Sequence, residues 1–217
     1  MVLVRADDGV RVFGYWHVDP KIRNGQRVVA YHTVVGAVLA PWEHVHFAEQ
    51  RNGMYVNPLR PGAMGPYSDT TIPTLGSLSV ESDGKLQPAA SAHGRIDLVV
   101  EAYDRTPIPI AGPWNGRPVT PALLEWRLLD RGKAVGGWHT AIDFRLTYPS
   151  NALFTSTYAK WTRQNRKVRD ARYCFYLVHD LDTRTLGDGG HRVEVRATDV
   201  RGNTGTAVFT LTVANSL

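Results

Sequence analysis

Turn-forming residues interrupt this chain at short intervals, and their spacing constrains the fold more than any other feature of the sequence. The chain has 217 residues, and its 20 glycines and 13 prolines are spread along the whole length. Between them lie short apolar or alternating runs, such as residues 10–17 and 96–103. Runs of this length between turn residues are typical of β-strands. With 43% hydrophobic and 21% charged residues, the composition is that of a folded globular protein, and we predict an all-β fold.

The first 60 residues predict a β meander. Strand-like runs occupy residues 2–4, 10–17, 28–31, 34–39 and 45–49. Asp7-Asp8-Gly9 and Asn52-Gly53 mark hairpin turns, because Asp-Gly and Asn-Gly accept the positive φ that tight turns require. A segment of this size buries only about 60% of its unfolded surface. We therefore expect marginal stability, with the strand near residues 2–5 as an exposed edge.

A proline-rich segment separates this meander from a second module. Residues 58–73 hold four prolines and two glycines, too many for the interior of a strand or helix. We place a linker at residues 61–73, between a first module at 1–60 and a second at 74–217. The second module contains seven strand-like runs, at residues 78–81, 96–103, 124–129, 141–146, 173–178, 192–197 and 207–213.

Seven strands in the second module predict a β-sandwich. Its closing hairpin, at residues 188–213, resembles the last two strands of bacterial immunoglobulin-like domains. Residues 151–170 interrupt the strand pattern with aromatic residues at helical spacing and several basic residues. We expect a helix or a long basic excursion there.

Two histidines at alternate positions carry the strongest chemical signal. On a strand, residues i and i+2 point to the same side, so His44 and His46 would share one face while Val45 and Phe47 pack behind them. Neutral imidazole binds zinc and also titrates near neutral pH. The pair could therefore bind a metal through both rings, or bind it through one ring while the other moves protons. A His-x-His pair alone is weak evidence.

The order of motifs around this pair resembles that of lysostaphin-type zinc endopeptidases. That family has Tyr-x-His, a Gly-x-x-Val turn, Ile-Gly, His-Leu-His-Phe and a closing Asn-Pro-Leu. The corresponding elements here, in the same order and near the same spacing, are Tyr15-Trp16-His17, Gly25-Gln26-Arg27-Val28, Val35-Gly36, His44-Val45-His46-Phe47 and Asn57-Pro58-Leu59. The resemblance covers residues 1–60 and implies a partial peptidase β-sheet in front of the immunoglobulin-like sandwich.

The resemblance also implies roles for three histidines. His46 would be a zinc ligand, while His44 and His17 would flank the zinc-bound water and the scissile carbonyl, in proton transfer and oxyanion stabilisation. Zinc would be the cofactor, lowering the pKa of its water and polarising the amide. The implied partner is a bacterial cell-wall peptide or an anionic wall polymer, and the implied location is extracellular or in the cell envelope.

The sequence departs from the family at the metal. The other two family ligands, a histidine and an aspartate, lie upstream of the strand that corresponds to residues 2–5, so this sequence supplies one ligand of three. The nearby acids Asp7, Asp8 and Asp19 fit turn chemistry better than replacement ligands. We expect the chain alone to be inactive as a peptidase.

Three explanations remain open for this departure. The chain is a fragment of a longer secreted peptidase, a short protein whose peptidase half has become a non-enzymatic binding module, or an unrelated β protein. The N-terminus has no signal-peptide pattern, which fits the fragment explanation.

Several other residues have an ordinary structural explanation beside a functional one. Cys174, the single cysteine, lies between aromatic residues and is expected to be a buried, inert thiol. Aspartates at strand ends could bind calcium or cap turns, and tryptophans could stack on carbohydrate or pack in the core. The aspartates are Asp104, Asp180, Asp182 and Asp199, and the tryptophans are Trp114, Trp126, Trp138 and Trp161. The remaining histidines, His32, His93, His139, His179 and His191, lack metal-ligand spacing.

Charge and hydropathy limit the remaining partners. A net charge of +5 gives a modest attraction to polyanions. The basic run at residues 163–172 could contact wall polymers or form a solvated face, and no nucleic-acid motif accompanies it, so we expect no nucleic-acid partner. No apolar run approaches the length needed to span a membrane.

Overall fold

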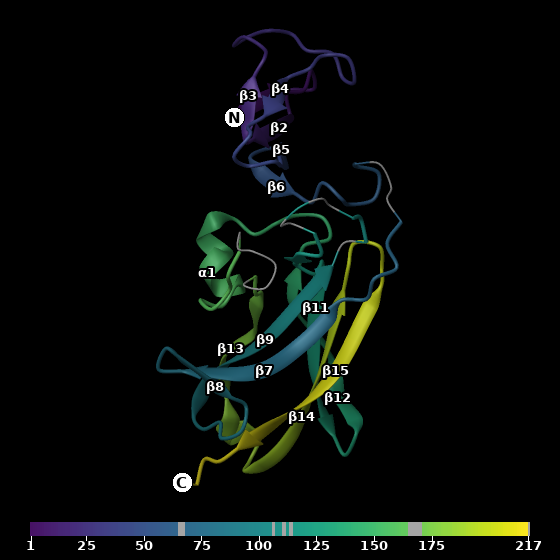
Figure 1. The fold of residues 1–217 in the computed structure, drawn as a ribbon. Coiled ribbons are helices and arrows are strands. Elements are labelled where there is room, and N and C mark those ends of the chain that lie inside the picture. Colours follow the sequence, from purple (N-terminus) through teal and green to yellow (C-terminus); the bar gives the residue numbers. More distant parts are fainter. Residues whose placement is uncertain (65–67, 106, 110–111, 113–114, 165–170, 217) are drawn as a thin grey trace. The chain divides into compact units, whose positions relative to one another are not determined.

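The computed structural model describes residues 1–217 except 65–67, 106, 110–111, 113–114, 165–170 and 217 (Figure 1). It confirms the all-β prediction, since antiparallel strands make up the fold and the described helical segments are single turns. The chain divides into an N-terminal unit, Met1–Met64 with Leu146–Ser150, and a C-terminal unit, Gly65–Arg145 with Asn151–Leu217. Each unit has its own sheets.

The N-terminal unit is built on a four-stranded sheet with the order β1-β2-β5-β6. These strands are β1 (Val2–Arg5), β2 (Arg11–Trp16), β5 (His46–Arg51) and β6 (Met54–Val56), and a second sheet pairs β3 (Val18–Pro20) with β4 (Gly36–Val38). The prediction of a strand at residues 28–31 is wrong. There the Val29 N–H donates to Thr33 Oγ1 at 2.9 Å, and the Thr33 N–H donates to the Val29 carbonyl at 3.0 Å. These local hydrogen bonds replace a strand ladder with a loop.

Both predicted hairpin turns are present in this unit. Asn52 and Gly53 join β5 to β6 with φ of 50° and 79°. Asp8 closes the turn between β1 and β2, because its carboxylate accepts the N–H groups of Val10 and Arg11 at 2.9 and 3.0 Å. These hydrogen bonds, led by the one from Arg11, lower the pKa of Asp8 to about 2. Among the strands that the structure describes, β1 pairs with β2 alone and is an edge strand, as expected.

A buried ion pair joins β5 to the segment that follows β6, and further backbone contacts tie this segment to residues 146–147. Glu49, which is 5% exposed, accepts two hydrogen bonds from the Arg60 guanidinium, each at 2.8 Å. The Asn57 N–H donates to the Leu146 carbonyl at 2.8 Å, and Val56 forms a bridge with Thr147. Residues 146–150, which the sequence analysis placed in the second module, therefore belong to the N-terminal unit.

The C-terminal unit consists of two antiparallel sheets (Figure 1). The first contains β7 (Thr74–Ser82), β8 (Lys85–Pro88), β9 (Arg95–Arg105), β10 (Pro118–Val119) and β13 (Cys174–Asp182). The second has the order β12 (Lys133–Asp143), β11 (Leu123–Asp130), β14 (Gly189–Thr198), β15 (Thr204–Val213). Each of the seven predicted runs overlaps a strand. The run predicted at 141–146 is shifted, because β12 begins before Gly136 and Gly137, which concealed it in the sequence.

Apolar side chains from both sheets form the core of the C-terminal unit. Its fully buried members include Leu98, Val100, Leu124, Phe175, Val193, Val195 and Leu211. On the other face of β9, Val99 and Cys174 pack with Ala159 from the segment that interrupts the strand pattern. Cys174 is buried, as predicted, and burial raises the pKa of its thiol to about 11, which disfavours the reactive thiolate.

The predicted interruption at residues 151–170 contains little helix. It begins with a 3₁₀ turn, η2 (Asn151–Leu153), and one α-helical turn, α1 (Phe154–Thr157). Tyr158 then forms a bridge with Phe175, and the two rings pack at a tilt of 41° with their centroids 5.0 Å apart. Residues 165–170 of the basic run lie outside the described residues.

Candidate metal centre

Three histidines converge in the N-terminal unit. His17, His44 and His46 each offer one ring nitrogen, and these nitrogens lie within 4.8 Å of one another. The ring centroids are 5.1 Å apart for His17 and His44, 4.7 Å for His17 and His46, and 4.9 Å for His44 and His46. All three site residues predicted from the sequence are therefore brought together.

His17 reaches this cluster through an unusual backbone conformation. It lies between β2 and β3 with a φ of 62°, which non-glycine residues adopt rarely. Its carbonyl accepts the Leu39 N–H at 2.9 Å, which holds the turn in place. The imidazole stacks on the Trp42 ring, with the centroids 4.1 Å apart and the planes at 17°.

His44 and His46 meet in a different way from the sequence prediction. β5 begins at His46, and His44 lies in a bend that follows Glu43, whose φ is 54°. The two rings nevertheless face each other, with the Nε2 atoms 2.9 Å apart. Val45 is 37% exposed rather than packed in the core, because the bend removes it from the alternation of the strand, whereas Phe47 packs against Tyr15 with centroids 5.3 Å apart.

Trp42 orients two of the three histidines, and the sequence analysis missed it. Its ring stacks on His17, and its carbonyl contacts Nδ1 of His44. Because a carbonyl oxygen only accepts hydrogen bonds, Nδ1 must carry the proton, and Nε2 then carries the lone pair. The available signal was an aromatic residue two positions before His-x-His.

The cluster fits a transition metal such as zinc on its donor chemistry. Imidazole nitrogens are common zinc ligands, and a backbone carbonyl that holds the second ring nitrogen is a frequent feature of such sites. The acids considered in the sequence pair elsewhere, with Asp8 bonded to Arg11 and Asp19 bonded to Lys21, both at 2.6 Å. Among the described residues, no carboxylate joins the three histidines.

A second group of titratable residues lies in the C-terminal unit. Carboxylate oxygens of Asp69, Asp104 and Asp199 lie within 4.8 Å of one another, and Asp104 and Asp199 are buried. Burial, together with the negative charges of Asp199 and Asp69, raises the pKa of Asp104 to about 6. Asp180 and Asp182, which the sequence analysis grouped with these residues, lie at the opposite end of β9.

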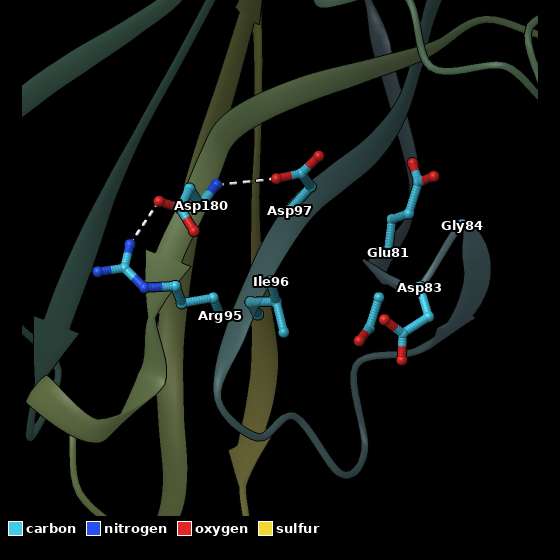
Figure 2. Close-up of a pocket in the computed structure, with 8 residues that line it drawn as sticks. Glu81, Asp83, Gly84, Arg95, Ile96, Asp97 and Asp180 are labelled. Atoms are coloured by element: carbon cyan, nitrogen blue, oxygen red, sulfur yellow. Dashed lines mark hydrogen bonds and ion pairs between the residues drawn. The ribbon is translucent and has the colours of Figure 1, made fainter.

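An open hollow near that opposite end is lined by acidic side chains (Figure 2). Three of the four carboxylates that line it have partners. Glu81 accepts the Tyr176 hydroxyl at 2.7 Å, Asp97 lies 3.0 Å from the His179 ring, and Asp180 pairs with Arg95. Most of the carboxylates in the hollow are therefore held by other side chains rather than directed together at one point.

The other tryptophans and histidines have structural contacts. Trp126 is buried and stacks on His139, and the guanidinium groups of Arg127 and Arg196 lie 4.3 and 4.2 Å from the Trp138 ring. Trp161 is partly buried, and Trp114 lies outside the described residues. The His191 ring contacts the Gly187 carbonyl at 2.9 Å, while His32 and His93 are exposed.

No family model, curated protein or solved structure matches this chain. In the part of the chain that the structure describes, no helix has the length and apolar character to cross a membrane.

Proposed function

We propose that the N-terminal unit is the C-terminal part of a lysostaphin-type zinc endopeptidase domain that acts on bacterial cell-wall peptides. The observation that carries this proposal is the convergence of His17, His44 and His46, whose ring nitrogens lie within 4.8 Å although His17 is remote in sequence. The motif order alone predicted that these three residues belong to one site. Extracellular or cell-envelope location is part of the same proposal.

Each histidine has a role in this proposal that its surroundings support. In the complete domain, zinc would supply an activated water and polarise the substrate carbonyl. His46, at the start of β5, would be one ligand. His44, with Nδ1–H directed to the Trp42 carbonyl, carries its lone pair on Nε2 and would act as the general base of the complete domain. His17, stacked on Trp42, would donate to the oxyanion.

Residues 1–217 contain only His46 of the three family ligands, so we expect no peptidase activity from this chain. Purified chain with added zinc should release no new amino groups from isolated peptidoglycan, while an active lysostaphin-type enzyme does so in parallel. Cleavage by the wild-type chain that is lost in His46→Ala would overturn the expectation of inactivity.

The family assignment itself is tested in the DNA that precedes the Met1 codon. A reading frame that encodes a histidine and an aspartate on successive strands supports it. An in-frame stop codon would favour the second candidate, a non-enzymatic wall-binding module. That candidate predicts that the chain sediments with insoluble peptidoglycan, and the net charge of +5 favours binding to its anionic polymers.

A further inference from the structure

We propose that His17, His44 and His46 form a complete three-nitrogen binding site for one zinc ion, made by this chain without the upstream ligands of the peptidase family. This inference concerns the same residues as the proposed function but does not rest on the family assignment. It also changes the roles of two residues, since His17 and His44 become metal ligands.

The distances between the rings are close to those of a metal site. Zinc–nitrogen bonds of about 2.0–2.1 Å at tetrahedral angles place two ligand nitrogens about 3.3 Å apart. The Nε2 atoms of His44 and His46 are 2.9 Å apart, within a few tenths of an ångström of that spacing. One ring nitrogen from each histidine lies within 4.8 Å of the other two, so modest rotation of the rings brings the three to ligand distance.

The hydrogen bond from His44 prepares this residue for metal binding. A ligand imidazole must present an unprotonated nitrogen, and a donor bond from its other nitrogen selects the required tautomer. The contact between His44 Nδ1 and the Trp42 carbonyl does this. Trp42 also stacks on His17, so one residue orients two of the three ligands.

The backbone around the cluster is held in conformations that cost energy. His17 and Glu43 have φ values of 62° and 54°, and left-handed conformations cost a non-glycine residue roughly 1–2 kcal/mol each. Such conformations persist where the surrounding structure enforces them, and they gather at binding and catalytic sites. One of these residues, His17, is itself a member of the cluster, and the other, Glu43, immediately precedes His44.

The cluster is also open enough to exchange metal with solvent. His46 is exposed, and His17 and His44 are half-buried. Three protein ligands leave the fourth position of a tetrahedral zinc ion for water. The site is therefore expected to bind one metal per chain with an accessible coordination position.

The test is metal binding by tag-free full-length chain, with zinc measured by competition against a chromophoric chelator and cobalt measured by its visible absorption. We expect one ion per chain and the intense absorption of four-coordinate cobalt. His17→Ala, His44→Ala and His46→Ala should each weaken zinc binding at least 10-fold. His32→Ala, a change at an exposed histidine of the same unit, should leave the affinity unchanged.

Trp42 is a positioning residue in this proposal. Its variants test whether its ring orients the His17 ligand, apart from any effect on folding. Trp42→Ala removes the ring that stacks on His17 but keeps the backbone carbonyl that accepts from His44, so it should weaken zinc binding by up to about 10-fold, less than loss of a ligand. Trp42→Phe keeps a stacking ring and should restore most of the affinity. Should an alanine variant fail to fold, NMR of the wild-type chain decides, because the ring signals of only three of the eight histidines should shift with zinc.

Two results would overturn the three-histidine site. One is weakening of zinc binding by His46→Ala alone, with His17→Ala and His44→Ala unchanged, which is the pattern that the family roles predict. The other is equal loss in His32→Ala and the three cluster variants, which would indicate non-specific binding. Neither result depends on whether the chain cleaves peptidoglycan, so failure of this site and failure of the proposed function can be told apart.

Discussion

The two units of this protein use buried apolar surface very differently. In the N-terminal unit the buried hydrophobic side chains are Val2, Val18 and Val56, and each retains 5–7% exposure. In the C-terminal unit, both sheets contribute side chains that are fully buried, among them Phe175 and Leu124. Most of the large exposed hydrophobic residues of the described chain belong to the N-terminal unit, including Trp42 and Tyr31.

This difference indicates what stabilises each unit. Burial of apolar surface contributes about 25 cal/mol per Å², so the C-terminal unit has a large hydrophobic contribution to its stability. The N-terminal unit depends more on particular polar contacts, such as the Glu49–Arg60 pair, and on any ion that its histidines bind. The unit with the smaller core therefore contains the candidate site, and the following predictions test this contrast.

The largest effect is expected in the core of the C-terminal unit. Phe175→Ala should lower its free energy of unfolding by about 4 kcal/mol, because a fully buried aromatic ring leaves a cavity. Hydrogen exchange measured by peptide should show faster exchange in the strands of the C-terminal unit and unchanged exchange in residues 1–64. Val208→Ala, at a side chain that is 39% exposed, should change the stability by less than about 0.5 kcal/mol.

In the N-terminal unit the corresponding weak point is an ion pair. Arg60→Ala should destabilise this unit by about 3 kcal/mol, because it leaves the buried Glu49 carboxylate without its main partner. Arg51→Ala removes the other, 46% exposed partner of Glu49 and should cost less than about 1 kcal/mol. Equal exchange rates of residues 1–64 in the two variants would contradict the importance of burial here.

Zinc should stabilise one unit and leave the other unchanged. At a free zinc concentration 100 times the dissociation constant, the N-terminal unit should gain about 2.7 kcal/mol. Slower hydrogen exchange in residues 1–64 would be the measured result, with no change in the strands of the C-terminal unit. His46→Ala should abolish the effect, and a similar slowing in both units would count against a local site.

The C-terminal unit should lose stability as the pH rises, because of Asp104. Its folded pKa of about 6 lies above the usual aspartate value of 3.8, so its contribution to stability is complete below about pH 4 and is lost as the pH rises through 6. Asp104→Asn imitates the neutral form and should stabilise the unit by about 2 kcal/mol at pH 8, with little effect at pH 4. Urea denaturation at the two pH values measures this.

The control for the Asp104 variant is Asp143, a carboxylate whose pKa is lowered rather than raised. The hydrogen bond from Arg145 lowers the pKa of Asp143, so Asp143→Asn should slightly destabilise the unit at pH 8. A gain in stability from both variants would point to a general effect of replacing aspartate by asparagine rather than to the buried carboxylate cluster.

The smallest expected effect concerns His179. Burial lowers its pKa, but the hydrogen bonds to the Ser156 carbonyl and Asp97 outweigh burial and raise it. Its stabilising contribution is therefore complete below the unfolded value of 6.5 and is lost as the pH rises through the folded value. The side chain is 44% exposed, so His179→Gln should cost less than about 1 kcal/mol at pH 6 and nearly nothing at pH 9. NMR titration of the ring measures the shift directly, and His93→Gln serves as the exposed control.

The sequence by itself determined the all-β class, the hairpin at Asn52-Gly53 and the burial of Cys174, because alternation, turn residues and aromatic neighbours act locally. It also predicted that His17, His44 and His46 belong together, through the order of motifs. It could not place residues 28–31 in a loop, because a Thr33 hydroxyl competes there with a strand ladder.

Only the tertiary structure decided how the histidine rings meet. The bend at Glu43 directs His44 toward His46, and Trp42 holds His44 through its carbonyl and His17 through its ring. The tertiary structure also brings Asp69 close to Asp104 and Asp199, and it places residues 146–150 in the N-terminal unit. Some of these contacts join residues far apart in the chain, and others depend on the backbone torsions of a single residue. Local sequence patterns encode neither.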